Sequence, residues 1–213
     1  MKQFPDKHFE LAVVDPPYGI GEDGSKNHTR GKKAKSKDYK GFIGKDFEPP
    51  SIEYFTELLR VSKNQIVWGA NHFITRILID SSCWLIWDKE NGETDFADCE
   101  LAWSSFKTAA RKFKYKWQGM LQQDMKNKEL RIHPTQKPVA LYKWILSNYA
   151  KQGDKILDTH LGSQSSRIAA YEMGFDFYGC ELDPEYFEQG NKRFEAWRKM
   201  NGQQLFDFND FTL

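Results

Sequence analysis

Short runs of apolar residues, separated by polar turns, predict a series of strands along the chain. The first run, Leu11-Ala12-Val13-Val14, lies in a predicted strand over residues 9–14. Further runs of strand length occur at residues 65–68, 83–87, 99–103, 155–157 and 177–180. Because these runs are short and bounded by turn-forming residues, they favour strands over buried helices.

Helical spacing of apolar residues occurs between these strands. Two segments show it most clearly: Ile52, Phe55, Leu58 and Leu59 after the capping residue Ser51, and Leu141, Ile145 and Leu146 after Pro138. Helices are also expected over residues 71–79, over residues 165–173 up to Gly174, and from Pro184 onward. Strands that alternate with helices predict an α/β fold, in which a mostly parallel sheet carries helices on both faces.

The composition indicates a globular protein. A chain of 213 residues with 39% hydrophobic content can bury a proper core, and we expect a single domain over residues 1–213. No apolar run approaches the ~18 residues of a membrane span, and no basic-then-apolar leader opens the chain. We therefore expect a cytoplasmic protein, in a bacterial or phage-infected cell, that is neither inserted in a membrane nor exported.

The three cysteines, Cys83, Cys99 and Cys180, are widely spaced. They form neither a disulfide framework nor a C-x-x-C metal site. Each lies in apolar sequence, so we expect reduced thiols in the core and no bound metal.

Positive charge is concentrated in two segments, although the formal net charge is only +1. Residues 26–45 contain eight Lys or Arg against one acid, and residues 107–117 contain five and no acid. Such blocks suit a phosphate backbone, whereas the alternative is a solvated loop that happens to be basic. The first block lies in a Gly- and Lys-rich stretch, residues 19–50, which predicts a long loop.

The first strand leads directly into Asp15-Pro16-Pro17-Tyr18. Open α/β sheets bind ligands at the carboxyl ends of their strands, where this segment would lie. Two prolines remove two backbone donors, so carbonyl acceptors remain beside a carboxylate and a flat ring. Such a site fits a planar amine, for example the exocyclic amino group of a nucleobase. The alternative is a strand that simply ends in a proline turn.

A second turn, residues 158–166, carries Asp158 at the end of a strand and then small residues. This arrangement brings backbone against a ligand at a helix N-terminus. Glu181 ends the next strand, where a carboxylate can hold the two hydroxyls of a ribose. The pattern allows a nucleoside or dinucleotide site. The upstream segment His133-Pro134-Thr135-Gln136-Lys137-Pro138 places polar groups between prolines, and its alternative is a loop that starts a helix.

Together D-P-P-Y, H-P-T-Q-K-P and D-x-x-x-G-S, in this order and spacing, resemble the amino-methyltransferases that act on DNA bases and use S-adenosylmethionine. The order is that of the circularly permuted group, and residues 84–89 and 100–103 resemble its late strands. The resemblance covers nearly the whole chain. It implies a Rossmann-like class I methyltransferase fold with a seven-stranded-type sheet, mixed but mostly parallel. It also implies a catalytic half over about residues 1–110, a target-recognition region over about 107–130, a cofactor-binding half over about 131–200 and a tail over 201–213.

The resemblance implies that D-P-P-Y receives a base flipped out of the duplex. Tyr18 would stack on this base, while Asp15 and the carbonyl of Pro16, with Pro17 in the same motif, would accept hydrogen bonds from the amine. The charge that develops on nitrogen would be stabilised by Asp15. D-P-P-Y favours adenine N6, because cytosine N4 enzymes of the group more often carry serine in place of the aspartate.

For the cofactor, the resemblance implies contacts from the second turn and from H-P-T-Q-K-P. Asp158 and the turn Gly162-Ser163 would hold the amino-acid end of S-adenosylmethionine, and Glu181 its ribose. The further residues expected near the cofactor are His160, Gln164 and Ser165 in the turn, and Thr135, Gln136 and Lys137 near the methionine portion.

Three departures from the family pattern are visible. Thr159 and His160 replace Pro and Phe, and Gln164 replaces the second glycine. Only residues 1–6 precede the first strand region, where related proteins usually have a further segment with an acidic residue near the cofactor's adenine. If position 164 needs positive φ, glutamine there is unfavourable. We therefore expect weakened cofactor affinity.

Double-stranded DNA is the expected partner. Residues 112–117 alternate basic and aromatic side chains at strand period, so one face would be cationic, or else the segment is an ordinary amphipathic edge strand. The expected phosphate contacts are Lys32, Lys33, Lys35 and Lys37 in the long loop and Lys112, Lys114 and Lys116 in this segment. The tail Gln204-Leu205-Phe206-Asp207-Phe208 resembles peptides that dock into bacterial sliding clamps, although packing on its own domain is favoured.

The leading hypothesis is thus a DNA adenine-N6 methyltransferase, either part of a restriction–modification pair or solitary. The sequence leaves open cytosine-N4 methylation, methylation of an amine on RNA, and a catalytically weak DNA-binding or subunit protein that keeps the fold. It also leaves open whether the protein forms a homodimer.

Overall fold

A seven-stranded sheet forms the centre of the fold in the computed structural model, which describes residues 1–21, 46–92, 97–118 and 121–207, with side chains as far as Asn201. The strand order is β5-β3-β4-β2-β1-β8-β9. Its strands are β1 (Phe9–Val14), β2 (Ser62–Trp68), β3 (Leu85–Asp88), β4 (Cys99–Ser104), β5 (Arg111–Lys114), β8 (Lys155–Asp158) and β9 (Asp176–Gly179). A separate two-stranded ladder joins β6 (Trp117–Gln118) to β7 (Leu121–Gln122).

Most neighbouring strands in the large sheet are parallel. The ladders β1–β2, β1–β8, β8–β9 and β3–β5 are parallel, whereas β4 runs antiparallel to both β2 and β3. The parallel neighbours β1 and β8 therefore end at the same edge of the sheet, which brings the segments after Val14 and Leu157 close together. This edge carries the candidate site.

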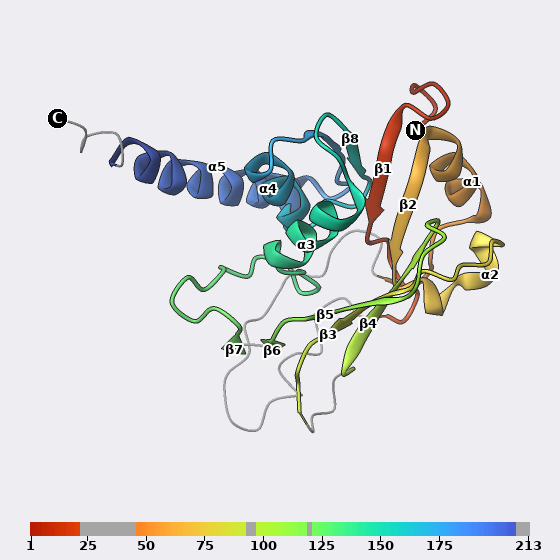
Figure 1. Cartoon of the computed structure of the whole chain (residues 1–213), viewed down its shortest axis with the longest axis horizontal. Coiled ribbons are helices and arrows are strands. Elements are labelled where there is room, and N and C mark those ends of the chain that lie inside the picture. The colour runs from red at the N-terminus through yellow and green to blue at the C-terminus, as the bar shows by residue number, and fades with distance from the viewer. Residues whose placement is uncertain (22–45, 93–96, 119–120, 208–213) are drawn as a thin grey trace.

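Helices cover both faces of the sheet (Figure 1). The helices are α1 (Ile52–Val61), the 3-10 turn η2 (Ala70–His72), α2 (Ile74–Ile77), α3 (Val139–Tyr149), α4 (Ser165–Glu172) and α5 (Pro184–Asp207). One apolar cluster packs α3 and α4 against the sheet, and a second packs α1 and α2 against the opposite face. The long helix α5 extends away from the body of the molecule (Figure 1).

Strand β1 shows why its run from Leu11 to Val14 is apolar throughout. Leu11 and Val13 belong to the cluster beneath α3 and α4, whereas Ala12 and Val14 belong to the cluster beneath α1 and α2. Side chains alternate between the faces of a strand, so a central strand covered on both faces needs a continuous apolar run. This explains the run that precedes Asp15.

The strand and helix predictions are confirmed with shifts of a few residues, but two expectations were wrong. The helix expected over residues 71–79 is split into η2 and α2, because Phe73 leaves the helical region with φ −144° and Leu78 is left-handed with φ 58°. Of the cysteines, only Cys83 is buried; Cys99 and Cys180 are exposed. Cys99 opens β4 before that strand enters the core, and Cys180 follows the edge strand β9.

Ser51 lies at the N-cap position of α1 but makes no side-chain capping hydrogen bond, and the buried face of that helix is Phe55, Leu58 and Val61. Within the described residues, none of the helices is both long and apolar enough to cross a membrane.

Candidate active site

The site is built where β1 and β8 end side by side. Asp15 follows β1 directly, and Asp158 is the last residue of β8. The two carboxylates influence each other electrostatically, since the charge of Asp15 contributes to the raised pKa of Asp158. The structure thus brings the D-P-P-Y segment and the second turn to one edge of the sheet, as the sequence predicts.

Asp15, Tyr18 and Lys137 form a compact cluster. The Tyr18 hydroxyl donates to Asp15 Oδ1 at 2.8 Å, and Lys137 Nζ donates to Asp15 Oδ2 at 2.6 Å and to the Tyr18 hydroxyl oxygen at 3.0 Å. The Lys137 side chain is only 3% exposed. The resemblance places Lys137 near the methionine portion of the cofactor; the structure places its ammonium group on the carboxylate of D-P-P-Y.

Glu100 and Lys89 extend this cluster. Glu100 lies in β4, and its Oε2 is 2.9 Å from Lys137 Nζ while its Oε1 is 2.5 Å from Lys89 Nζ. Two carboxylates and two ammonium groups therefore balance in charge within a mostly buried space. Sequence reasoning missed both residues as members of the site, since it indicated only that they lie in or next to late strands.

The ionisation of this cluster follows from burial and pairing. Burial acts to raise the pKa of Glu100, but Lys137 and Lys89 outweigh it and lower that pKa to about 2. Burial likewise acts to lower the pKa of Lys137, but Asp15 and Glu100 outweigh it and raise the pKa. For Asp15, burial dominates over the charge of Lys137, so its pKa is raised. At neutral pH Glu100 is ionised and Lys137 is a cation.

The Tyr18 ring is fixed from two sides. The ring of His72 stacks on it, with centroids 5.3 Å apart and an interplanar angle of 16°. Gly69, with φ 69°, lies so close that a Cβ there would be 2.0 Å from Tyr18 Cε1. The turn after Tyr18 is held by buried Asp46, whose carboxylate accepts the backbone N–H groups of residues 18–20.

Asp158 is almost completely buried and accepts two hydrogen bonds. These come from the backbone N–H of His160 at 2.9 Å and from the Ser166 hydroxyl. Burial raises the pKa of Asp158 to about 7. Burial also lowers the pKa of the His160 imidazole, to about 4, and its Nδ1 lies 3.0 Å from the Thr159 hydroxyl. A buried carboxylate with only neutral donors favours the arrival of a cation.

The turn after β8 is tied to Glu181 and to α5. Glu181 Oε2 accepts the backbone N–H of Gly162, which has φ 48°, at 2.7 Å. The Ser163 and Ser165 hydroxyls are 3.1 Å apart, and Arg193 of α5 donates to the Ser163 carbonyl at 2.7 Å and to the Ser165 hydroxyl at 3.0 Å. The residues predicted to contact the ribose and the amino-acid end therefore lie in two segments, after β9 and after β8, that a hydrogen bond joins.

Gln164 occupies the left-handed region with φ 62°, the conformation that glycine adopts most easily. Its side chain is fully buried and directed at α5, where Nε2 donates to the Phe187 carbonyl at 3.1 Å. Its Oε1 accepts from Arg167 at 2.8 Å. The requirement for positive φ is thus confirmed, whereas the expected bulk is accommodated between α4 and α5.

The H-P-T-Q-K-P segment divides its residues between two surroundings. Gln136 is buried and holds its own loop, since Oε1 accepts the backbone N–H of Ile132 at 2.9 Å. Thr135 is exposed, with its hydroxyl 3.0 Å from His133 Nδ1. Of the three residues expected near the methionine portion, Lys137 alone reaches Asp15.

The basic segment that contains β5 lies at the far edge of the sheet, four strands from β1. That separation is roughly 19 Å at the usual strand spacing. Lys112 and Lys114 are exposed and pair with Asp88 at 3.6 Å and Glu90 at 3.9 Å. Lys116 is also exposed, and the aromatic residues between these lysines face inward. The alternation is confirmed; Lys32, Lys33, Lys35 and Lys37 lie outside the described residues.

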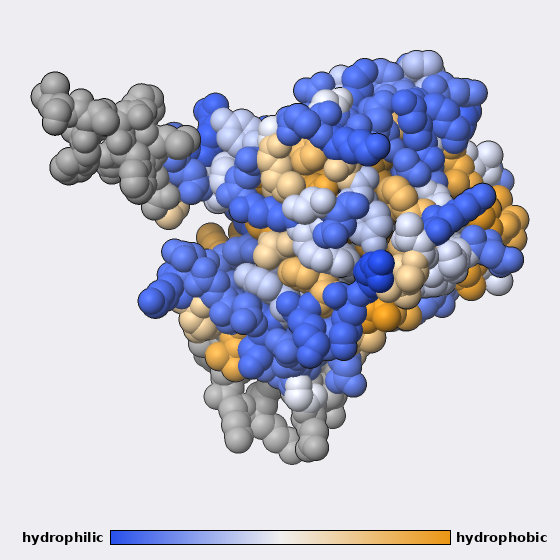
Figure 2. Space-filling model, in the orientation of Figure 1, coloured by the Kyte–Doolittle hydropathy of each residue, from blue (hydrophilic) through white to orange (hydrophobic). Residues whose placement is uncertain are grey.

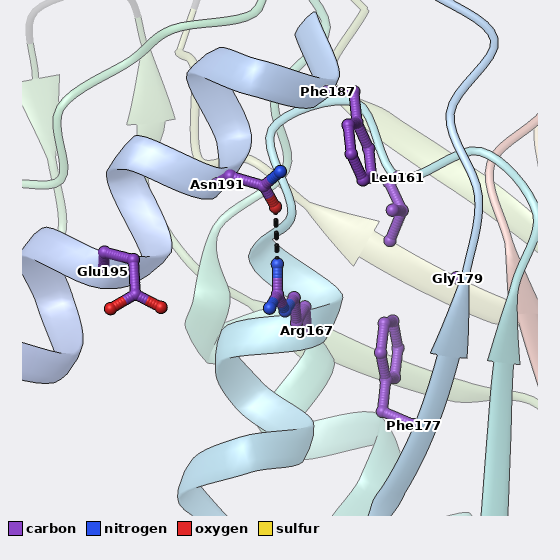
Figure 3. A pocket seen from close by; sticks show the side chains of 7 residues that line it. All are labelled: Leu161, Arg167, Phe177, Gly179, Phe187, Asn191 and Glu195. Carbon is purple, nitrogen blue, oxygen red and sulfur yellow. Dashed lines mark hydrogen bonds between the residues drawn. The ribbon is translucent and has the colours of Figure 1, made fainter. Parts of the chain in front are cut away.

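The surroundings of the site combine a polar surface with a separate cavity. Hydrophilic residues cover much of the face drawn in Figure 2, including the part over β3 to β5. A cavity of about 440 Å³ lies between β9 and α5, with Leu161, Phe177 and Phe187 on one side and Arg167 and Asn191 on the other (Figure 3). The D-P-P-Y segment and Lys137 are not among its lining residues.

The fold is that of the class I methyltransferases. It is similar to the crystal structure of the M1.HpyAVI–SAM complex, with a TM-score of 0.54 and 21% sequence identity over 90% of each chain. A family model described as DNA methylase matches residues 81–192, more than half of the chain. The protein therefore belongs to the DNA methylase family.

Two curated relatives match part of the chain. The type II methyltransferase M2.DpnII of Streptococcus pneumoniae is 39% identical over 69 residues, which are 32% of this chain and 26% of that protein. The DNA adenine methyltransferase YhdJ of Escherichia coli (strain K12) is 35% identical over 77 residues, or 36% and 26% of the two chains. The match thus spans about a quarter of the length of either relative.

Proposed function

We propose that this protein transfers a methyl group from S-adenosylmethionine to the exocyclic N6 amine of adenine in double-stranded DNA. The observation that carries the proposal is the position of Asp15-Pro16-Pro17-Tyr18, at the end of β1 and beside Asp158 at the end of β8. The family supports methylation of DNA, and one relative is named as an adenine methyltransferase.

The residues at the end of β8 fit the cofactor. Asp158 is a buried carboxylate with a raised pKa and neutral partners, which suits the α-ammonium group at the amino-acid end of S-adenosylmethionine. The left-handed turn at Gly162 leads into the N-terminus of α4, where backbone can approach a ligand closely. When bound, the cofactor supplies an electrophilic methyl group on a sulfonium.

The D-P-P-Y segment would prepare the amine. The nitrogen lone pair of adenine N6 is delocalised into the ring, so the free amine is a poor nucleophile. Hydrogen bonds from its two protons to Asp15 and to the Pro16 carbonyl favour a pyramidal nitrogen, which can attack the methyl carbon in line. The cofactor would supply its methyl group to this nitrogen as the methyl–sulfur bond breaks, and the proton that N6 loses would leave along its hydrogen bond to Asp15. Asp15 stabilises the positive charge that develops on N6.

Tyr18 supplies the stacking surface for a base taken out of the duplex. Its ring is held by Gly69 and faces His72, so its position is set before any base arrives. The segment with Lys112, Lys114 and Lys116 would contact phosphates further along the duplex. The proposed location is the cytoplasm of a bacterial or phage-infected cell. Formation of a homodimer stays an open question. The clamp-like segment at Gln204–Phe208 lies outside the described side chains.

Mass spectrometry of nucleosides tests the proposal directly. Unmethylated plasmid DNA and, in a parallel reaction, unmethylated RNA are incubated with the protein and S-adenosylmethionine, beside an Asp15→Asn variant that keeps the shape of the side chain. We expect N6-methyladenine with the wild type and at most a trace with the variant. N4-methylcytosine instead would identify a cytosine enzyme, and methylation confined to RNA would change the substrate. No methylated base from folded protein would favour a DNA-binding or subunit role.

A further inference from the structure

The ammonium group of Lys137 lies between two carboxylates from distant parts of the chain. Its Nζ is 2.6 Å from Asp15 Oδ2, after β1, and 2.9 Å from Glu100 Oε2, in β4. Lys137 itself comes just before α3, so the fold assembles this arrangement from three separate segments. A buried cation with two anionic partners can move from one to the other without losing its compensation.

In this arrangement Asp15 has no carboxylate oxygen without a donor. Oδ1 receives the Tyr18 hydroxyl at 2.8 Å and Oδ2 receives Lys137. An ammonium group and the amino group of a base are both N–H donors, so Lys137 takes one of the acceptor positions on Asp15 that the amine would use. The ring of His72 stacks on Tyr18 and helps to fix its position. The protein's own ammonium group thus occupies an acceptor that the amine of a base would use.

Glu100 is the anion with which Lys137 can pair when it leaves Asp15. It is ionised, it already contacts Nζ, and Lys89 holds its other oxygen. Without Glu100, a Lys137 displaced from Asp15 would be a buried cation with no anion, which is strongly unfavourable. Glu100 therefore determines how easily Asp15 is released.

We propose that Lys137 stands in for the target amine in the free protein, and that Glu100 is a positioning residue which takes over Lys137 when the base enters. This proposal rests on the proposed methyl transfer. Lys89 moderates the exchange, because it competes with Lys137 for Glu100. The order of events is entry of the base, transfer of Lys137 to Glu100, and hydrogen bonding of the amine to Asp15.

Steady-state methylation of DNA by three variants tests this exchange. In Glu100→Gln, Lys137 stays on Asp15, so we expect KM for DNA to rise about tenfold and kcat to fall, while the Kd for S-adenosylmethionine is unchanged. In Glu100→Gln/Lys137→Met no ammonium group occupies Asp15, so KM for DNA should return towards the wild-type value. A merely structural network predicts instead that the double variant is at least as impaired as the single one.

The Lys89→Met variant gives an effect of opposite sign and covers the case in which Glu100→Gln does not fold. With Lys89 removed, Glu100 binds Lys137 more strongly, so KM for DNA should decrease. An unchanged or raised KM for this variant, or a double variant as slow as Glu100→Gln, would overturn the stand-in role while leaving methyl transfer intact. A wild type that methylates no nucleic acid would overturn the proposed function, and this inference with it.

Discussion

Gly190 in α5 lies directly against the side chain of Gln164. A Cβ on Gly190 would be 2.6 Å from Gln164 Cγ, a distance that real Cβ atoms essentially never show. Gln164 has φ 62° and opens α4, so the absence of a side chain at Gly190 compensates for a glutamine where the family resemblance predicts glycine. The two helices can pack only because one of these two positions is small.

We therefore expect Gly190→Ala to destabilise the protein by about 1–3 kcal/mol through overpacking. Gln164→Gly in the same chain should remove the clash and recover most of this loss. Urea denaturation of the wild type, both single variants and the double variant gives the coupling free energy, expected at about 0.5–3 kcal/mol. Additive effects would show that the contact does not limit packing.

The elements that position the site were predictable because their signals are local. The run 11–14 is apolar at every position since both its faces are covered, and Pro184 starts α5 as its position in the sequence indicates. The role of Glu100 was not predictable, because an acid within an antiparallel strand gains a partner only when β4 is placed beside β2. The same holds for Asp46, which lies in the sequence far from the turn it supports.

The exposure of Cys99 and Cys180 shows the limit of reasoning from neighbouring residues. Both were expected in the core, yet Cys99 lies beside Glu100 at the start of a strand and Cys180 follows an edge strand. Burial depends on the order of strands across the sheet, which periodicity along the chain does not specify.

Cofactor binding should depend on pH through Asp158. Burial raises the pKa of this carboxyl to about 7, so the group is mostly protonated in the free protein at acidic pH. Because S-adenosylmethionine brings positive charge, we expect it to bind the ionised form. Its Kd should then rise about tenfold for each pH unit below 7. Isothermal titration calorimetry between pH 5 and roughly 8 measures this slope.

The contribution of Asp158 to protein stability depends on pH in the opposite direction to cofactor binding. The folded-state pKa of Asp158 is higher than its ordinary value of 3.8, so the folded protein retains a proton that the unfolded chain has released. Its contribution to stability is present at acidic pH and is lost as the pH rises through 7.

An Asp158→Asn variant should show weaker cofactor binding with a flatter pH dependence. An equally steep dependence in that variant would assign the titration to another group.

Gly69 should be essential for the position of Tyr18. A Gly69→Ala variant places a methyl group 2.0 Å from the Tyr18 ring and must displace it. We expect kcat for methylation to fall about a hundredfold, because small displacements in an active site have effects of this size.

Gly92→Ala is the matched control for this variant. Gly92 has a similar φ of 65°, but a Cβ there meets nothing within 4 Å. Both variants should lose about 1 kcal/mol or more of stability to backbone strain, whereas only Gly69→Ala should lose activity. Equal activity losses would mean that backbone strain, and not the Tyr18 ring, is responsible.

The lysines around β5 should govern the salt dependence of DNA binding more than protein stability. Lys112 and Lys114 form exposed pairs with Asp88 and Glu90, and such pairs contribute only about 0–1 kcal/mol. We expect replacement of Lys112, Lys114 and Lys116 by Gln to change the melting temperature little. If these lysines bind phosphates, the slope of log Kd against log salt concentration should decrease by about 0.9 for each lysine–phosphate pair that the substitutions remove.

Neutralising Asp88 and Glu90 should change DNA binding in the opposite direction to neutralising the lysines. Asp88→Asn/Glu90→Gln leaves the lysines in place and removes the acids that partly neutralise them. DNA binding should therefore become tighter at low salt, since the local potential is more positive. Fluorescence anisotropy with a labelled duplex over a range of salt concentrations measures both effects. An unchanged slope in the lysine variant, together with unchanged affinity in the acid variant, would remove this edge of the sheet from the DNA interface.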